Sequence, residues 1–301
     1  MGGEKRRMRR TVLGRTGLEV SRIALGGYPF GGVNRANGWD PWSEDGRRTA
    51  IATINRALDL GITYIDTAPS YGAGNSEALI GQVMQTRRDE CVLATKVGWS
   101  GMDKQAVIDS VYESLKRLRT DHLDLVQFHG GMYTAQEYHH IVDGGPLDGL
   151  RRLKEQGDIA FIGLTAEEPW TARQFLDVPD IDVVQLAYNL IYQAAARHVL
   201  EDARAANVGV VTMRTMTSGI FQRAARHLAP TWQDAADLYE VCLKFVLSDS
   251  RVHTAIVGMR WPEEVERNVA LVDGFDPDFD LAELPRMTAH VYQAEDADLP
   301  T

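Results

Sequence analysis

The sequence predicts a single-domain (β/α)8 TIM barrel, and three observations support this prediction. Eight short β-rich segments alternate with amphipathic helical segments along the 301 residues. Strands that alternate with helices pair in parallel, because a parallel connection needs a crossover. Eight such units in about 280 residues fit a closed barrel better than an open sheet, which usually shows fewer strands and a GxGxxG turn after the first.

A short antiparallel hairpin is expected ahead of the barrel, in the segment TVLGRTGLEVS at 11–21. The strand segments that follow are rich in β-branched residues and bounded by polar loops; they are 22–26, 63–66, 91–96, 123–128, 160–164, 182–186, 208–213 and 254–258. Between the strands, the periodicity of apolar residues predicts helices, which include 47–61, 104–118, 146–157, 196–207, 232–247 and 262–272. In 104–118 the spacing of four, four and three places Val107, Val111, Leu115 and Leu118 on one face.

No linker or change of composition divides the chain, so we expect the barrel to span 11–290, with loose tails at 1–10 and 291–301. The longest segments without periodicity follow the first, fourth and seventh strands, at 27–43, 129–145 and 214–230. In a barrel these loops all lie at the C-terminal face, where TIM barrels carry their active sites.

Composition excludes some classes of function. The formal net charge of −10 argues against non-specific nucleic-acid binding, which depends on a basic surface. No apolar run is long enough to span a bilayer, and the basic N-terminus lacks the apolar region of a signal peptide. Cys91 and Cys242 lie in apolar segments, which predicts buried thiols in a reducing cytoplasm. We therefore expect a cytoplasmic protein without nucleic-acid or membrane partners, and the oligomeric state stays open.

Four polar residues follow three neighbouring strands of the predicted barrel. Asp66 ends the second strand, and Tyr71 lies in the loop after it. Lys96 ends the third strand, and His129 follows the fourth. Asp66 alone is typical of a helix cap, Tyr71 of loop packing and His129 of a satisfied polar residue. A lysine that closes an apolar strand is less usual and needs a buried partner, which Asp66 supplies.

The four side chains suit proton transfer to an oxygen. A phenol has a pKa of roughly 10, and a nearby ammonium favours the phenolate, so Lys96 is expected to lower the pKa of Tyr71. His129 could donate a hydrogen bond to a substrate oxygen. Such a site would protonate a carbonyl oxygen as a hydride reaches its carbon, so a redox cofactor is required. A Schiff-base lyase that uses Lys96 is an alternative, although the acid and the phenol fit hydride chemistry better.

At these residues the chain resembles the aldo-keto reductases. The resemblance covers about 11–272 and rests on GITYIDTAPSYGAGNSEALIG, ATKVG, TDHLDLVQFHG and the opening LGRTGLEVSRIALGG. It implies a (β/α)8 barrel that binds an extended nicotinamide nucleotide, with Asp66, Tyr71, Lys96 and His129 as the catalytic tetrad and Tyr71 as general acid/base. It also implies a site without a metal ion.

The resemblance also implies a set of cofactor contacts, some of which depart from the family's pattern. Near the nicotinamide, Thr165 and Gln185 match the positions that hold the carboxamide, although Ala166 replaces an asparagine. After the seventh strand, Met213 takes the place of a stacking aromatic residue and Arg214 that of a serine. The remaining expected contacts at this end are Gly27, Tyr28, Asp66, Thr215, Met216, Ser218 and Gly219.

The segment VGMRWPEEVERNVA resembles the family's adenosine-phosphate site. Gly258, Met259 and Arg260 precede a helix start at Pro262, and a helix N-terminus favours anions. The guanidinium of Arg260 suits a 2′-phosphate, to which Arg267 could add, so NADP is expected rather than NAD. Glu264 and Asn268 match the adenine-side positions.

The resemblance predicts NADPH-dependent reduction of an aldehyde or ketone to an alcohol, or the reverse oxidation. A nucleotide-binding regulatory or redox-sensing subunit with little turnover is the alternative, because potassium-channel β-subunits share the family's fold. Tyr28, Phe30, Tyr71, Trp99 and His129 are expected to contact the substrate, and their aromatic content suggests a carbonyl compound with an apolar body.

Overall fold

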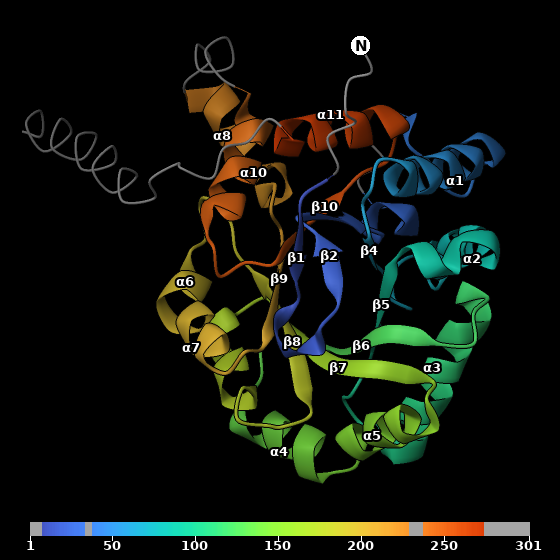
Figure 1. Ribbon diagram of the computed structural model, residues 1–301, viewed down its shortest axis with the longest axis vertical. Coiled ribbons are helices and arrows are strands. Elements are labelled where there is room, and N and C mark those ends of the chain that lie inside the picture. The colour runs from blue at the N-terminus through green and yellow to red at the C-terminus, as the bar shows by residue number, and fades with distance from the viewer. Residues whose placement is uncertain (1–7, 34–37, 229–236, 274–301) are drawn as a thin grey trace, which may run out of the picture.

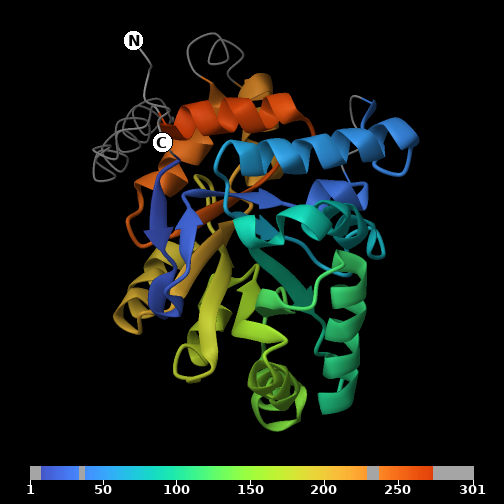
Figure 2. The same ribbon diagram turned by 45° about the vertical axis from the view of Figure 1, so that its right-hand side comes forward.

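The computed structural model describes residues 8–33, 38–228 and 237–273. Eight parallel strands close into a barrel in the order β10-β3-β4-β5-β6-β7-β8-β9, with helices outside it (Figure 1, Figure 2). The predicted fold class is therefore confirmed. Residues 1–7 of the expected N-terminal tail, and 274–301 with the expected C-terminal tail, lie outside the described residues.

The observed strands agree with the predicted segments to within two residues at each end. They are β3 (Ile23–Gly26), β4 (Tyr64–Asp66), β5 (Val92–Val97), β6 (Leu123–His129), β7 (Ile159–Ala166), β8 (Ile181–Ala187), β9 (Gly209–Met213) and β10 (Thr254–Gly258). Most strand residues are buried, because one face packs inside the barrel and the other against the helices.

The predicted hairpin is present and closes the N-terminal end of the barrel. β1 (Arg10–Val12) pairs antiparallel with β2 (Glu19–Ser21), and the two are joined by the 3-10 helix η1 (Gly14–Thr16). Leu13 is fully buried against the interior residues of the strands, and Arg15 donates a hydrogen bond to the carbonyl of Pro179 at 3.0 Å, just before β8. In Figure 1 the hairpin lies in front of the barrel strands.

The helices begin where the sequence provides caps. The Ser43 hydroxyl accepts from the amide of Gly46 at the start of α1, and the Asp103 carboxylate caps α3 in the same way. The buried face of α3 contains the four apolar residues predicted for it. The α-helices are α1 (Glu44–Asp59), α2 (Asn75–Arg87), α3 (Lys104–Leu118), α4 (Ala135–Asp143), α5 (Pro146–Gln156), α6 (Ala194–His198), α7 (Leu200–Ala205), α8 (Ile220–Leu228), α10 (Leu238–Ser248) and α11 (Pro262–Asp273).

Two helix predictions need correction or restriction. The predicted helix at 196–207 is broken into α6 and α7 at Val199, whose φ of −133° is not helical. The predicted helix at 232–247 is described only from 237 onward, where α10 begins after its cap Asp237. Four further 3-10 segments are η2 (Tyr28–Gly31), η4 (Arg88–Glu90), η5 (Pro169–Phe175) and η6 (Thr217–Gly219). Among the described helices, none has the length and apolar character needed to cross a membrane.

The barrel interior changes from apolar to polar toward its C-terminal end. Ala24, Tyr64 and Leu125 belong to an apolar cluster inside the barrel. Because side chains alternate along a strand, Asp66 lies on the same inward face as Tyr64, two residues nearer the C-terminal end. Register pairs Lys96 of β5 with Gln127 of β6 at a similar height. The inward residues above the apolar cluster are therefore polar, so the polar part of the interior lies at the C-terminal end of the barrel.

Candidate active site

A cavity of about 960 Å³ opens at the C-terminal ends of the strands. One end reaches Asp66, Tyr71 and Lys96, and the other reaches Arg260 and Asn268 beside the start of α11. Its lining therefore joins the predicted catalytic residues to the predicted adenosine-phosphate residues, which the chain separates by more than a hundred positions. A cavity that joins these two sets of residues can hold a ligand that contacts both.

The floor of the cavity contains a buried ion pair. Lys96 Nζ lies 2.7 Å from both carboxylate oxygens of Asp66 and donates a third hydrogen bond to the Thr67 carbonyl at 2.8 Å. Burial raises the pKa of Asp66, although Lys96 opposes the rise. Burial alone would lower the pKa of Lys96, but the nearby Asp66 and Tyr71 raise this pKa above its usual value. Each charge compensates the other, and either one alone would be buried without a partner.

Tyr71 is positioned by an unusual loop between β4 and α2. Gly72, Ala73 and Gly74 all have positive φ, of 63°, 51° and 90°, and only the glycines adopt such angles without strain. A Cβ at Gly31 would lie 2.7 Å from the Tyr71 carbonyl carbon, so only glycine allows this approach of η2 to the loop. The loop holds the Tyr71 ring over Lys96, whose Nζ is 4.9 Å from the ring centroid.

The pKa of Tyr71 differs from the sequence-based expectation. Burial raises the pKa of the phenol, and this effect exceeds the lowering by the Lys96 charge and hydrogen bond. The predicted lowering by Lys96 is therefore present, but burial outweighs it and the pKa of Tyr71 lies above its usual value. Burial is the largest effect, and the charge of the nearby Asp66 carboxylate adds to it.

His129 ends β6 beside the phenol. Its ring centroid lies 5.9 Å from that of Tyr71, and its Nδ1 is 3.4 Å from the Ser70 hydroxyl. Burial, and secondarily the Lys96 charge, lower the pKa of His129 to about 4. The imidazole is therefore neutral at physiological pH. When the Ser70 hydroxyl donates to Nδ1, the ring proton is on Nε2, which can donate one hydrogen bond.

Most of the predicted contact residues line this cavity. They include Tyr28, Thr165, Gln185, Met213, Arg214, Thr215, Met216, Ser218, Gly219, Gly258, Arg260, Glu264, Arg267 and Asn268. The Thr165 hydroxyl is already engaged, since it donates to the Gly130 carbonyl and accepts from the Gly130 amide, both at 3.1 Å. The Thr215 hydroxyl, in contrast, is buried and finds no hydrogen-bond partner among the described residues.

Four predicted contacts do not line the cavity. Phe30 is fully buried and packs against Trp39, with ring centroids 6.3 Å apart. Trp99 packs against Tyr133 at 5.7 Å, and Met259 belongs to the apolar core. Gly27 lies behind the cavity wall, where its amide donates to the Asp66 carbonyl at 2.7 Å. An aromatic residue after a strand packs inward as readily as it faces the mouth, so sequence position alone does not separate the two.

Arg214 forms an ion pair that the sequence did not predict. Its guanidinium contacts both carboxylate oxygens of Glu167, which follows β7, and its Nη1 lies 3.1 Å from the Ser218 hydroxyl. Arg214, Thr217 and Ser218 all have positive φ, between 51° and 58°. The loop after β9 therefore holds three non-glycine residues in left-handed backbone, and Arg214 reaches from it to the residue that follows β7.

The far end of the cavity contains partly exposed ion pairs. Arg260 donates from its amide to Glu264 at 2.6 Å and from its guanidinium to the same carboxylate at 3.1 Å, and its guanidinium lies over the Trp261 ring. Arg267 pairs with Asp237 and lies over the Tyr239 ring. Both guanidinium groups thus border the cavity while paired with carboxylates.

Three functional candidates were missed by sequence reasoning. Ser70, beside His129, and Glu167, beside Arg214, line the cavity. Gln127 lies just beneath it, fully buried, with its side-chain nitrogen 3.0 Å from the Gln185 oxygen. The sequence offered a signal for Gln127, because side chains alternate along a strand and an amide two residues before His129 lies on the same face as His129.

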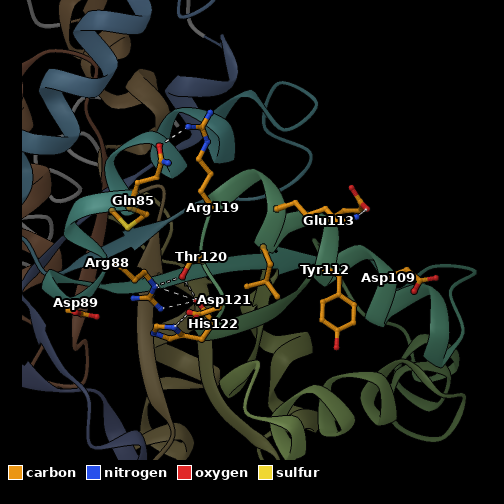
Figure 3. Close-up of a pocket in the computed structure, with 13 residues that line it drawn as sticks. Gln85, Arg88, Asp89, Asp109, Tyr112, Glu113, Arg119, Thr120, Asp121 and His122 are labelled. Carbon is orange, nitrogen blue, oxygen red and sulfur yellow. Dashed lines mark hydrogen bonds and ion pairs between the residues drawn. The ribbon is translucent and has the colours of Figure 1, made fainter.

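A second hollow is less suited to chemistry. It lies outside the barrel along α2, η4 and α3, and its lining side chains pair mainly with one another (Figure 3). Arg119 reaches Gln85, and Arg88 reaches Thr120, while Tyr112 points away from both. This open groove holds no residue of the buried ion pair. In the part of the chain that the structure describes, no group of His, Cys, Asp and Glu is arranged to hold a metal ion.

Comparison with known proteins agrees with this geometry. Residues 22–279 match the model of the Aldo/keto reductase family. The chain belongs to this family. Among curated relatives, Aldo-keto reductase YhdN of Bacillus subtilis is 31% identical over 225 residues, which cover 71% of this chain and 63% of that protein. L-galactose dehydrogenase of Arabidopsis thaliana is 28% identical over 291 residues and 87% of each chain.

A solved aldo-keto reductase shows the same fold. The structure from Klebsiella pneumoniae in complex with NADPH aligns with a TM-score of 0.75 at 24% identity, covering 93% of this chain and 95% of that one. Aldo-keto reductases are oxidoreductases, so family membership supports oxidoreduction of carbonyl compounds.

Proposed function

We propose that the protein catalyses the NADPH-dependent reduction of an aldehyde or ketone to an alcohol, or the reverse oxidation, as an oxidoreductase acting on CH–OH groups. The observation that carries the proposal is the buried Asp66–Lys96 pair beneath the Tyr71 phenol, with a neutral His129 beside it. This arrangement favours proton donation from one phenol to one oxygen.

The residues of the cavity fit a dinucleotide. Thr215 offers a buried hydroxyl that has no partner among the described residues, and Gln185 offers an amide at the catalytic end. Arg260, Arg267 and Asn268 would hold the adenosine phosphate at the far end. The Klebsiella pneumoniae neighbour is described in complex with NADPH, which agrees with NADP as the proposed cofactor.

Bound NADPH would supply the hydride to the carbonyl carbon. Tyr71 would transfer its proton to the carbonyl oxygen, and Lys96 would stabilise the resulting phenolate through its charge. His129 would donate a hydrogen bond to the same oxygen and so orient it. Asp66 would hold Lys96 protonated and in place. In the alcohol-oxidising direction Tyr71 would act as the base.

The substrate class is proposed from the residues that line the mouth. Tyr28 is half exposed, and its ring meets the Tyr71 ring edge-on at 5.0 Å. It would contact an apolar or ring-bearing part of a small carbonyl compound. We place the reaction in the cytoplasm, in keeping with the free, buried thiols of Cys91 and Cys242.

The direct test is consumption of NADPH with a panel of aliphatic and aromatic aldehydes and ketones. The proposal predicts turnover with at least one of them, and much less with NADH at equal concentration. Tight NADPH binding without turnover on any carbonyl would favour the alternative, a nucleotide-sensing subunit. Absence of both binding and turnover would reject both functions.

A further inference from the structure

Gln127 occupies a central place beneath the catalytic residues. It lies on β6, and its side chain is fully buried. The amide nitrogen is 3.0 Å from Gln185 Oε1 on β8 and 3.5 Å from Asp66 Oδ1 on β4. One amide group thus contacts residues from strands on both sides of its own, across the floor of the cavity.

The barrel makes room for this crossing. β7 lies between β6 and β8, and register pairs Gln127 with Gly163 of β7. A Cβ at Gly163 would lie 3.2 Å from Gln127 Cγ and 2.6 Å from the Val183 carbonyl. A larger residue would therefore crowd the path of the Gln127 side chain, and glycine is the residue that leaves it open.

The chemistry of the contacts sets the orientation of both amides. A carboxylate only accepts hydrogen bonds, so Gln127 must turn its NH2 group toward Asp66. The other hydrogen of that group then faces Gln185, which must present its oxygen. The Gln185 nitrogen is consequently turned away from Gln127, toward the weak acceptor Met213 Sδ at 3.8 Å and toward the Asp66 carboxylate, whose pKa it helps to lower.

We propose that Gln127 is a positioning residue that couples the catalytic carboxylate to the cofactor-binding amide. It fixes Gln185 with its NH2 group toward the cavity, so that a carbonyl oxygen of the bound nicotinamide carboxamide replaces the sulfur as acceptor. The same amide supports the charge of Asp66 and thereby the Lys96–Tyr71 pair. This inference rests on the proposed function, because Gln185 is assigned to the nicotinamide end.

The first experiment separates the two ends of the nucleotide. Gln127→Met keeps the length of the side chain and removes both donated hydrogen bonds. Calorimetric titration should show NADP+ binding weakened about fivefold, the scale of one neutral hydrogen bond. Binding of adenosine 2′,5′-bisphosphate, which lacks the nicotinamide end, should be unchanged. The control Gln174→Met removes an amide that binds backbone carbonyls of Tyr133 and Thr171 and should change neither.

The outcomes are distinguishable. Unchanged NADP+ binding in Gln127→Met, or equal weakening of both ligands, would overturn the inference, since the second result indicates a general structural role. A wild type that binds NADP+ and reduces carbonyls keeps the proposed function whatever Gln127→Met shows. A wild type that binds neither ligand overturns the proposed function, and this inference with it.

A second variant tests the coupling to the phenol by a readout that packing does not change. Gln127→Glu is nearly isosteric but places a carboxylate near Asp66. The added negative charge should raise the pKa of Tyr71, so the alkaline limb of alcohol oxidation should move to higher pH. If the folded variant keeps the alkaline limb of its pH profile at the wild-type pH, the coupling between residue 127 and Tyr71 is contradicted.

Discussion

The two ends of the cavity both pair a cation with a carboxylate, but in opposite environments. The side chains of Lys96 and Asp66 are 1% and 3% exposed, whereas those of Arg260 and Glu264 are 24% and 30% exposed. At the buried end neither partner can turn to water, so the pair is a permanent part of the floor. At the exposed end water and ions can replace either partner, so Arg260 can exchange Glu264 for a phosphate.

The difference implies different responses to substitution. Removing one member of the buried pair leaves an uncompensated charge in the barrel, so stability and chemistry are lost together. Removing Arg260 from the partly exposed pair leaves Glu264 in contact with water, so we expect the effect to be confined to the ligand proposed for this end.

The largest effect is expected for Lys96→Met. It should lower the free energy of unfolding by about 3–5 kcal/mol, because Asp66 remains buried without its partner. Urea denaturation measures this. The double variant Lys96→Met/Asp66→Asn should recover part of the loss, and Lys116→Met at an exposed pair should not shift the midpoint. If Lys96→Met lowers the free energy of unfolding as little as Lys116→Met does, the proposed difference between the buried and the exposed pair is contradicted.

Arg260→Ala should have a smaller effect, restricted to one nucleotide. A charge-assisted contact contributes about 1.5–3 kcal/mol, so NADP+ should bind roughly tenfold to a hundredfold more weakly while NAD+ is unchanged. The difference should shrink at high salt, because the site is partly exposed. Tryptophan-fluorescence titration of both nucleotides measures it, with Arg56→Ala, at an ion pair to Glu266 outside the cavity, as control.

Equal weakening of the two nucleotides by Arg260→Ala would mean that Arg260 supports the loop before α11 and does not recognise the 2′-phosphate. A wild type that prefers NAD+ would overturn the assignment of NADP.

The smallest effect is expected for the pH dependence caused by His129. Its pKa of about 4 in the folded protein, caused by burial and then by Lys96, lies below the value of roughly 6.5 for an unfolded chain. Between these values the unfolded state binds more protons, so stability should fall as the pH is lowered through this window. His129→Asn should reduce the slope between about pH 6.5 and 5, where few carboxylates titrate. An identical slope in both proteins would contradict the lowered pKa.

Some features of the fold and the site could be predicted from the sequence, and others could not. The strands and the positions of Asp66, Lys96 and His129 could be predicted, because parallel neighbours in a barrel end at one face. The partner of Arg214 could not, because Glu167 lies 47 residues away and the contact depends on a positive φ. The direction of the pKa of Tyr71 also required the structure, since it is a balance between burial and two opposite charges.

The central claim is that Tyr71 donates the proton to the substrate oxygen, and Tyr71→Phe tests it most directly. The variant keeps the ring and loses only the hydroxyl. We predict that its turnover number for carbonyl reduction falls at least about a hundredfold, the usual scale of general acid catalysis, while its NADP+ affinity stays at the wild-type value. Wild-type turnover in a Tyr71→Phe protein with normal NADP+ affinity would contradict this account.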